Sequence, residues 1–243
     1  MATSTRKQRE IEEREGLILA TAADLLGRHG YLGFTMDQIA AATEYSKGTI
    51  YNHFRSKEEV LVALCTQTGR VRVRWFERAA LFQGNSRERM SAIGVSVELF
   101  VKLHPEHFAG EQIATAESIR DKISQERADE LLSSEFRCMD TVRGIVRDAI
   151  AHGDLEMPEG TDPTTLVFGL WSMSYGGLSM IAGKPSLADL GLDDPLATLR
   201  RNQQALMDGH GWRPLTNDWD YEATRARVLE EVFPDEARRA GLV

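Results

Sequence analysis

Residues 34–59, FTMDQIAAATEYSKGTIYNHFRSKEE, contain three helix starts in close succession. Thr35 followed by Gln38 matches a capping box, in which the N-cap residue and the third helical residue satisfy each other's backbone N–H groups. Ser46 is of a residue type preferred at an N-cap, and Ser56 opens a second capping box. Starts so close together predict short, tightly turned helices followed by a longer one. We expect these helices at 35–43, at 47–54 and from 56 to about 80.

The second short helix carries side chains suited to reading DNA. It offers Lys47 for a phosphate or a guanine, Gly48 for close backbone approach, and Thr49 for a hydrogen bond or a thymine methyl contact. Ile50 and Phe54, four residues apart, are expected to face a core. Such a helix must be exposed to enter the major groove. The candidate DNA contacts are Thr35, Ser46, Lys47, Gly48, Thr49, Tyr51, Asn52, His53 and Lys57.

The alternative for this segment is an ordinary helix bundle. Short capped helices occur in bundles too, and the polar side chains would then form a solvated face. In that case Thr35 is only a cap.

Three spaced blocks resemble the DNA-binding domain of the tetracycline-repressor (TetR) family: FTMDQIA at 34–40, SKGTIYNHF at 46–54 and SKEE at 56–59. The resemblance covers roughly residues 14–62. It implies an all-helical homodimer, a palindromic operator, and a divergent C-terminal domain that binds a small inducer. Repression is the common outcome in the family, and transcriptional activation is the alternative.

One dipeptide, Glu44-Tyr45, departs from the resembled family. The turn between the two short helices usually carries glycine followed by a small aliphatic residue. A left-handed backbone at Glu44 would cost roughly 1 kcal/mol relative to glycine. We expect either a slightly different turn or packing of Tyr45 that offsets the strain.

The rest of the chain also indicates helices, because apolar residues recur at helical spacing and no run alternates with period two. Gly30 is a predicted helix stop. Residues 209–220 are expected to be irregular. The predicted fold is all-α, with a three-helix helix-turn-helix DNA-binding domain at 1–60 and a helical ligand-binding and dimerisation domain at 61–243. The further helices are expected near 8–29, 87–103, 106–119, 125–152, 164–182, 195–208 and 221–232.

Residues 164–183 contain no charged side chain. Their length approaches that of a membrane span, but serines, threonines and glycines make the stretch too polar for one. Small residues at 172, 176, 179 and 183 form a seam that would let another helix approach closely. We expect this helix to pair with the one at 195–208 in a four-helix dimer interface, with intramolecular core packing as the alternative. The predicted interface residues are Phe168, Ser172, Gly176, Ser179, Leu196, Leu199 and Leu206.

An apolar cavity with a few polar groups is the typical form of a small-molecule site. Large side chains of the C-terminal part would suit such a cavity and favour a mostly apolar, aromatic or acyl effector. Core packing is the alternative for each of them. The candidate ligand-binding residues are Trp75, Phe100, Phe108, Phe136, Met139, Trp171 and Tyr175.

The net charge of −8 lies mostly outside the predicted DNA-binding segment. Residues 1–60 hold eight basic and nine acidic side chains, which leaves 21 of the 29 basic and 28 of the 37 acidic residues elsewhere. Global acidity predicts weak nonspecific DNA affinity, so a few specific contacts must supply the binding.

Other classes of function find little support in the sequence. No nucleophile elbow, phosphate loop, dinucleotide fingerprint or zinc-protease helix occurs, so we expect no enzyme, no catalytic residue and no cofactor. His104 and His107 flank Pro105, which favours a helix end over a metal site. Cys65 and Cys138 are expected to be buried thiols rather than redox sensors, and the polar N-terminus predicts a cytoplasmic protein. An all-helical interaction protein without DNA binding remains the rival function.

Overall fold

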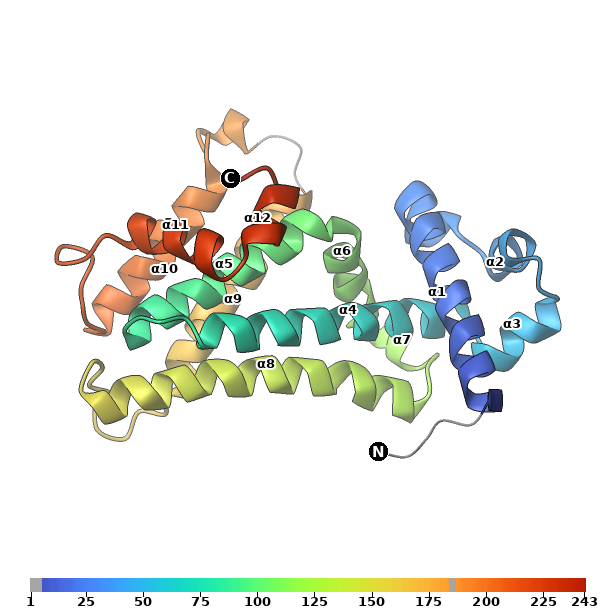
Figure 1. Ribbon diagram of the computed structural model, residues 1–243, viewed down its shortest axis with the longest axis horizontal. Helices are drawn as coiled ribbons and strands as arrows, with labels where there is room; N and C mark the ends of the chain where they lie inside the picture. The colour runs from blue at the N-terminus through green and yellow to red at the C-terminus, as the bar shows by residue number, and fades with distance from the viewer. Residues whose placement is uncertain (1–5, 184–186) are drawn as a thin grey trace. The chain divides into compact units, whose positions relative to one another are not determined.

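The computed structural model describes residues 6–183 and 187–243, and within these ranges it is helical without a strand (Figure 1). The predicted all-α class is therefore confirmed. A short 3-10 turn, η1, covers Ala188–Leu190. The helices are α1 (Arg6–Gly33), α2 (Met36–Thr43), α3 (Lys47–His53), α4 (Lys57–Ala80), α5 (Ser86–Leu103), α6 (Pro105–Ala114), α7 (Glu117–Arg120), α8 (Gln125–His152), α9 (Thr164–Gly183), α10 (Pro195–Gly209), α11 (Tyr221–Glu231) and α12 (Pro234–Arg239).

The predicted helices agree closely with the observed ones, including the irregular stretch between α10 and α11. Gly30 interrupts α1 with φ 67° and ψ 174°, a conformation that only glycine adopts without strain. The predicted stop at Gly30 is thus a break in the helix. The short helix α12 was not predicted, and the helix expected at 106–119 is divided into α6 and α7. Segments of four to six residues are too short for a recognisable apolar period.

One compact unit, called the N-terminal unit below, comprises Met1–Gly69 and Glu106–Ser133. Its core joins the apolar faces of α1, α2, α3 and the start of α4 to residues of α6 and α7, with Ile18, Phe34, Ile39, Ile50, Phe54 and Leu61 fully buried. The α6–α7 segment and the first residues of α8 therefore belong to the same unit as the helix-turn-helix. The domain boundary expected at 60–61 stays a prediction.

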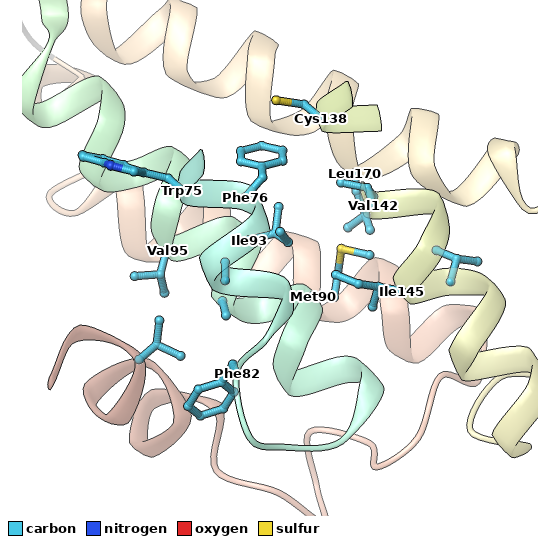
Figure 2. Close-up of a cluster of buried hydrophobic side chains, with 14 of the residues drawn as sticks. Trp75, Phe76, Phe82, Met90, Ile93, Val95, Cys138, Val142, Ile145 and Leu170 are labelled. Atoms are coloured by element: carbon cyan, nitrogen blue, oxygen red, sulfur yellow. The ribbon is translucent and has the colours of Figure 1, made fainter. Parts of the chain in front are cut away.

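The other unit, called the C-terminal unit below, comprises Arg70–Pro105 and Ser134–Val243. Figure 2 shows part of its core, in which side chains of α4, α5, α8 and α9 meet. The two C-terminal helices, α11 and α12, also pack against α5 and add Val228, Leu229 and Phe233 to this core.

Arg87, on α5, makes buried polar contacts that hold the segment after α10 against this helix. Its side chain is fully buried and pairs with Asp208, Nη1 to Oδ1, at 2.7 Å. The same guanidinium donates to the carbonyl oxygens of Trp212 and Pro214. Trp212, itself fully buried, donates its indole N–H to Ser86 Oγ at 2.9 Å. The irregular stretch is thus held by buried polar contacts, which are costly to leave unpaired.

The predicted pairing of α9 with the helix at 195–208 is confirmed, since α9 packs against α10. Two glycines make the close approach. A Cβ at Gly169 would lie 3.1 Å from Leu206 Cδ2, and one at Gly177 would lie 3.0 Å from Leu199 Cδ1. The contact therefore uses a different glycine face from the seam expected at 172, 176, 179 and 183.

Candidate DNA interface and effector unit

Both short helices begin at the caps that the sequence predicts. Thr35 accepts from Gln38 N at 3.2 Å through Oγ1, and Thr35 N donates to Gln38 Oε1 at 2.8 Å, which completes the capping box. Ser46 Oγ accepts from Thr49 N at 3.1 Å and lies 2.9 Å from Thr49 Oγ1. Because these bonds satisfy N–H groups that a short helix leaves open, they fix where α2 and α3 start.

The turn between α2 and α3 contains the one non-glycine residue with positive φ in the described part of the chain. Glu44 has φ 58° and ψ 19°, the left-handed conformation considered from the sequence. Tyr45 is half-buried and packs against the core of the N-terminal unit. The turn therefore keeps the left-handed geometry without a glycine, and Tyr45 packing accompanies it.

α3 has one buried side and one exposed side. Ile50 and, at the C-cap, Phe54 are fully buried, as expected. Lys47, Gly48 and Asn52 are exposed, and Tyr51 is 48% exposed. Thr49 and His53 are half-buried. A short helix with an apolar anchor and a free polar side matches what a major-groove reader requires.

Lys47 is held by a carboxylate of the preceding helix. Its Nζ donates to Asp37 Oδ2 at 2.7 Å, and both side chains are largely exposed. The hydrogen bond and charge of Asp37 raise the pKa of Lys47. No sequence pattern indicates this pair, because the two residues lie ten positions apart on different helices.

Lys57 is already engaged inside its own unit. Its ammonium lies 4.4 Å from the centroid of the Tyr31 ring and donates to the Tyr31 carbonyl oxygen at 3.2 Å. Thr35 likewise uses its backbone N–H within its cap. These two predicted contacts would have to rearrange to bind a phosphate, whereas Tyr51 and Asn52 need not.

Two carboxylates at the start of α4 hold the loop before α8. Glu58 accepts from Tyr31 Oη at 3.0 Å and from Lys122 Nζ at 3.2 Å. Burial acts to raise the pKa of Glu58, but hydrogen bonds from its own backbone, Lys122 and Tyr31 outweigh it and lower that pKa. Burial, with help from Glu58, raises the pKa of Tyr31 to about 12. Glu59 accepts from Ser124 N at 3.3 Å. Nothing in the sequence pointed to Lys122 or Ser124.

The predicted dimer residues fall on two sides of α9 and α10. Phe168, Ser172 and Gly176 are exposed, and no atom lies within 4 Å of a Cβ built at Gly176. Ser179 is half-buried and bonds the carbonyl oxygen of its own helix at Tyr175. Gly183 lies at the edge of the described residues. Leu196, Leu199 and Leu206 are half-buried on α10.

The predicted ligand residues are not gathered in one place. Trp75 and Phe100 are buried side by side, with ring centroids 6.0 Å apart. Phe233, the N-cap of α12, lies 5.7 Å from Trp75, centroid to centroid, so the C-terminal part of the chain packs against this aromatic pair. Phe108 is buried in the N-terminal unit. Met139 is half-buried, while the side chains of Phe136, Trp171 and Tyr175 are exposed.

A shallow hollow lies among α5, α9 and α10, away from all of the predicted ligand residues. Its polar lining includes Gln203, which donates to Ser174 Oγ at 2.7 Å, and Glu98, which pairs with Arg200. Leu196 and Leu199 complete its apolar side. The two cysteines are buried, and no group of three potential metal-binding residues occurs in the described ranges. The side chain of His107 lies outside the described residues.

Two short capped helices joined by a tight turn, with the second exposed on its polar side, define a helix-turn-helix DNA-binding protein. Residues 18–64 match the family model described as bacterial regulatory proteins, tetR family. These residues therefore form a TetR-family DNA-binding domain, and the resemblance seen in the three sequence blocks is confirmed. No curated protein matches it significantly.

Solved structures of TetR-family regulators share the fold of most of the chain. PfmR from Thermus thermophilus is 19% identical, with a TM-score of 0.59 and coverage of 79% of this chain and 97% of that one. FadR from Bacillus subtilis, solved with stearoyl-CoA, is 16% identical, with a TM-score of 0.61 and coverage of 80% and 98%. KstR2 of Mycobacterium tuberculosis, described as a ketosteroid transcriptional regulator, is 16% identical, with a TM-score of 0.57 and coverage of 81% and 94%. About a fifth of this chain thus has no counterpart in them, and none of the three is described as an enzyme.

Proposed function

We propose that the chain is a cytoplasmic, homodimeric repressor that is released from a palindromic operator by a small apolar effector. The single observation that carries the proposal is the two-sided character of α3. Ile50 anchors the helix in the core, while Lys47, Gly48, Tyr51 and Asn52 are exposed on the other side. An interaction protein without DNA binding would not need side chains suited to phosphates and base edges together on this exposed side.

The exposed side chains of α3 suit two kinds of DNA contact, one to phosphates and one to bases. Tyr51 and His53 would meet phosphates and set the docking, as most protein–DNA hydrogen bonds do. Lys47, Thr49 and Asn52 would read base edges. Ser46 positions Thr49 through its hydroxyl, and Gly48 leaves room for the backbone to approach the duplex.

A gel shift against the promoter of the chain's own or a neighbouring gene tests DNA binding. We expect a sequence-specific shift that weakens as salt rises. Tyr51→Ala should weaken it without lowering the melting temperature, because Tyr51 is largely exposed. Ile50→Val, on the buried side of the same helix, is the matched control and should lower stability while keeping the specificity. An unchanged affinity in both Tyr51→Ala and Lys47→Ala would contradict the contact assignment.

Exposed apolar side chains on α9 support a dimer. Phe168, Trp171 and Tyr175 are each between 40% and 58% exposed and follow one another at helical spacing, i, i+3 and i+7. Neighbouring rings are in contact, with the Phe168 and Trp171 centroids 6.1 Å apart and those of Trp171 and Tyr175 6.4 Å apart. An apolar patch of this size is typical of an interaction site. We propose that a second copy covers it, with Ser172 and Gly176 at the closest approach.

A membrane is the other environment that would suit α9. By length and composition the window Thr164–Ala182 reaches the hydropathy of a membrane span, at a mean of 1.2. Its opposite side, however, buries Leu166, Val167 and Leu170 in the core of the C-terminal unit. A helix with one side buried in a protein core and aromatic side chains on its other side favours a protein partner over a membrane. We therefore assign the chain to the cytoplasm.

The effector is proposed to be a mostly apolar molecule. FadR was solved with stearoyl-CoA, and KstR2 is described as a ketosteroid regulator, so both support this class. We place its site beside Trp75 and Phe100, where entry requires Phe233 to move. Thermal-shift measurements with stearoyl-CoA and with a ketosteroid test this: a ligand at 100 times its Kd should stabilise the protein by about 2.7 kcal/mol. The same ligand should release the DNA, and stabilisation without release would contradict an effector role.

Repression would follow from the spacing of two α3 helices in the dimer. Successive major grooves on one face of DNA are about 34 Å apart, so both helices bind only in a dimer of matching geometry. An effector changes the DNA affinity only by binding a non-matching state more tightly. A reporter gene downstream of the operator separates repression from activation by the sign of the change when the protein is removed.

A further inference from the structure

The helix-turn-helix has an unusual charge balance. Between Thr35 and Phe54 the only lysine is Lys47 and no arginine occurs, while Asp37 and Glu44 supply two carboxylates. DNA is attracted chiefly through lysine and arginine charges that neutralise phosphates. In the free protein the one lysine of this segment is bonded to one of the two carboxylates, at 2.7 Å. The segment therefore offers a phosphate no unpaired ammonium.

We propose that Asp37 tunes DNA affinity through Lys47: it holds Lys47 in the free protein, and Lys47 leaves it only where DNA offers a better acceptor. The inference rests on the proposed DNA-binding function of α3. Asp37 touches no base or phosphate in the scheme, so it is a positioning residue that acts through Lys47.

The ion pair between Asp37 and Lys47 is weak enough for DNA to replace Asp37 as the partner of Lys47. Both side chains are more than 60% exposed, and an exposed ion pair changes an equilibrium by about fivefold at most. A well-placed contact between a lysine and guanine discriminates between bases by more than that. Exchange of Asp37 for a guanine is therefore favourable, whereas exchange for an arbitrary phosphate is close to neutral. Asp37 also repels phosphates by its own charge, which acts in the same direction.

The geometry permits the exchange without unfolding either helix. Asp37 lies in the first turn of α2 and Lys47 is the first residue of α3, so only the lysine side chain must swing. The lysine backbone stays fixed, because Ser46 caps α3 independently of Lys47. The Asp37 carboxylate remains exposed to water after the exchange and keeps its favourable place at the N-terminus of α2.

Asp37→Asn tests the role of Asp37 with two duplexes. One is a random-sequence duplex of about 30 base pairs, and the other is a duplex enriched from a random library by the wild-type full chain. Loss of the pair should free Lys47 for one additional phosphate contact, which steepens the slope of log K against log salt by up to about 0.9. Nonspecific affinity should rise by up to about fivefold, the strength of the pair that is lost. Affinity for the enriched duplex should rise at least as much, because Lys47 must leave Asp37 in that complex too.

Glu44→Gln is the matched control, since it removes the same charge from the same segment and keeps the side-chain shape. Lys47→Met in combination with Asp37→Asn completes a double-mutant cycle. If Asp37 acts through Lys47, Asp37→Asn in the Lys47→Met background should change nonspecific affinity no more than Glu44→Gln does. Melting temperatures of all variants, measured without DNA, separate loss of the fold from loss of the ion pair.

Two results overturn the proposal and differ from each other. If Asp37→Asn and Glu44→Gln shift the salt slope and the affinities equally, Asp37 contributes only general charge, and DNA binding by α3 still stands. If the wild-type chain enriches no sequence from the library, the proposed function itself fails and the role of Asp37 fails with it.

Discussion

Trp171→Ala is expected to weaken the proposed dimer about a thousandfold. The Trp171 side chain is 49% exposed on α9, between the exposed rings of Phe168 and Tyr175. A large aromatic side chain buries up to about 250 Å², so a second copy that covers the exposed half would remove about 120 Å² from water.

The free energy follows from the area that alanine cannot bury. Alanine would recover about a third, which leaves roughly 80 Å² per copy, or about 2 kcal/mol at about 25 cal/mol per Å². Each dimer contains two copies of Trp171, so the total loss is about 4 kcal/mol, which corresponds to about three powers of ten in Kd.

Sedimentation velocity over a dilution series measures the monomer–dimer Kd directly. Phe136→Ala is the matched control, because Phe136 is also an exposed aromatic side chain, at 62%, but lies on α8. It should leave the dimer Kd unchanged. Equal Kd values for the wild type and Trp171→Ala, or a wild-type chain that stays monomeric at micromolar concentration, would refute the assignment of α9 to the interface.

Three further variants test local features. Glu44→Gly should raise the free energy of unfolding by up to about 1 kcal/mol in urea titration, because glycine relieves the left-handed strain at φ 58°. Glu58→Gln should destabilise the protein at pH 7 and less so below about pH 4: the lowered pKa of Glu58 gives stability that is present above its unfolded value near 4.3 and lost as pH falls through the folded value. Arg87→Met should cost about 3 kcal/mol or more in thermal unfolding, because it removes the cationic partner of Asp208 and the donor to the carbonyl groups of Trp212 and Pro214.

The contrary results for these variants are distinct. Destabilisation by Glu44→Gly would mean that the turn is not strained and that only the entropy of the unfolded chain changed. A stability difference for Glu58→Gln that is independent of pH would rule out the ionised carboxylate as its source. A neutral Arg87→Met would indicate that the polar contacts of Arg87 add no net stability to the segment after α10.

Local signals predicted the helix-turn-helix well. Caps and capping boxes act over three or four residues, so Thr35 and Ser46 marked the helix starts. The left-handed Glu44 is one of the two outcomes that the sequence left open. The buried positions of Ile50 and Phe54 followed from their spacing. These features depend on neighbours in the chain, which a sequence displays directly.

Contacts between residues far apart in the chain could not be predicted from the sequence. The ion pair of Lys47 with Asp37 joins two exposed charges, and the bond of Lys122 to Glu58 joins an exposed charge to a buried one. The spacing of neither pair follows a helical period. The two faces of α9 were also not separable, because small and aromatic residues alternate around the helix and only the position of Leu199 reveals which glycine α10 uses. The ligand residues could not be predicted for a similar reason: the sequence does not distinguish an aromatic side chain in a core from one in a cavity or an interface.

In the proposed dimer, two copies of α3 bind DNA side by side. A hydroxyl-radical footprint on the duplex enriched by the wild-type chain shows whether they do. We expect two protected patches on one face of the duplex, about one helical turn or about 34 Å apart, which weaken together in Tyr51→Ala. A single protected patch, two patches out of phase with the helical turn, or protection unchanged by substitutions on the exposed side of α3 would contradict it.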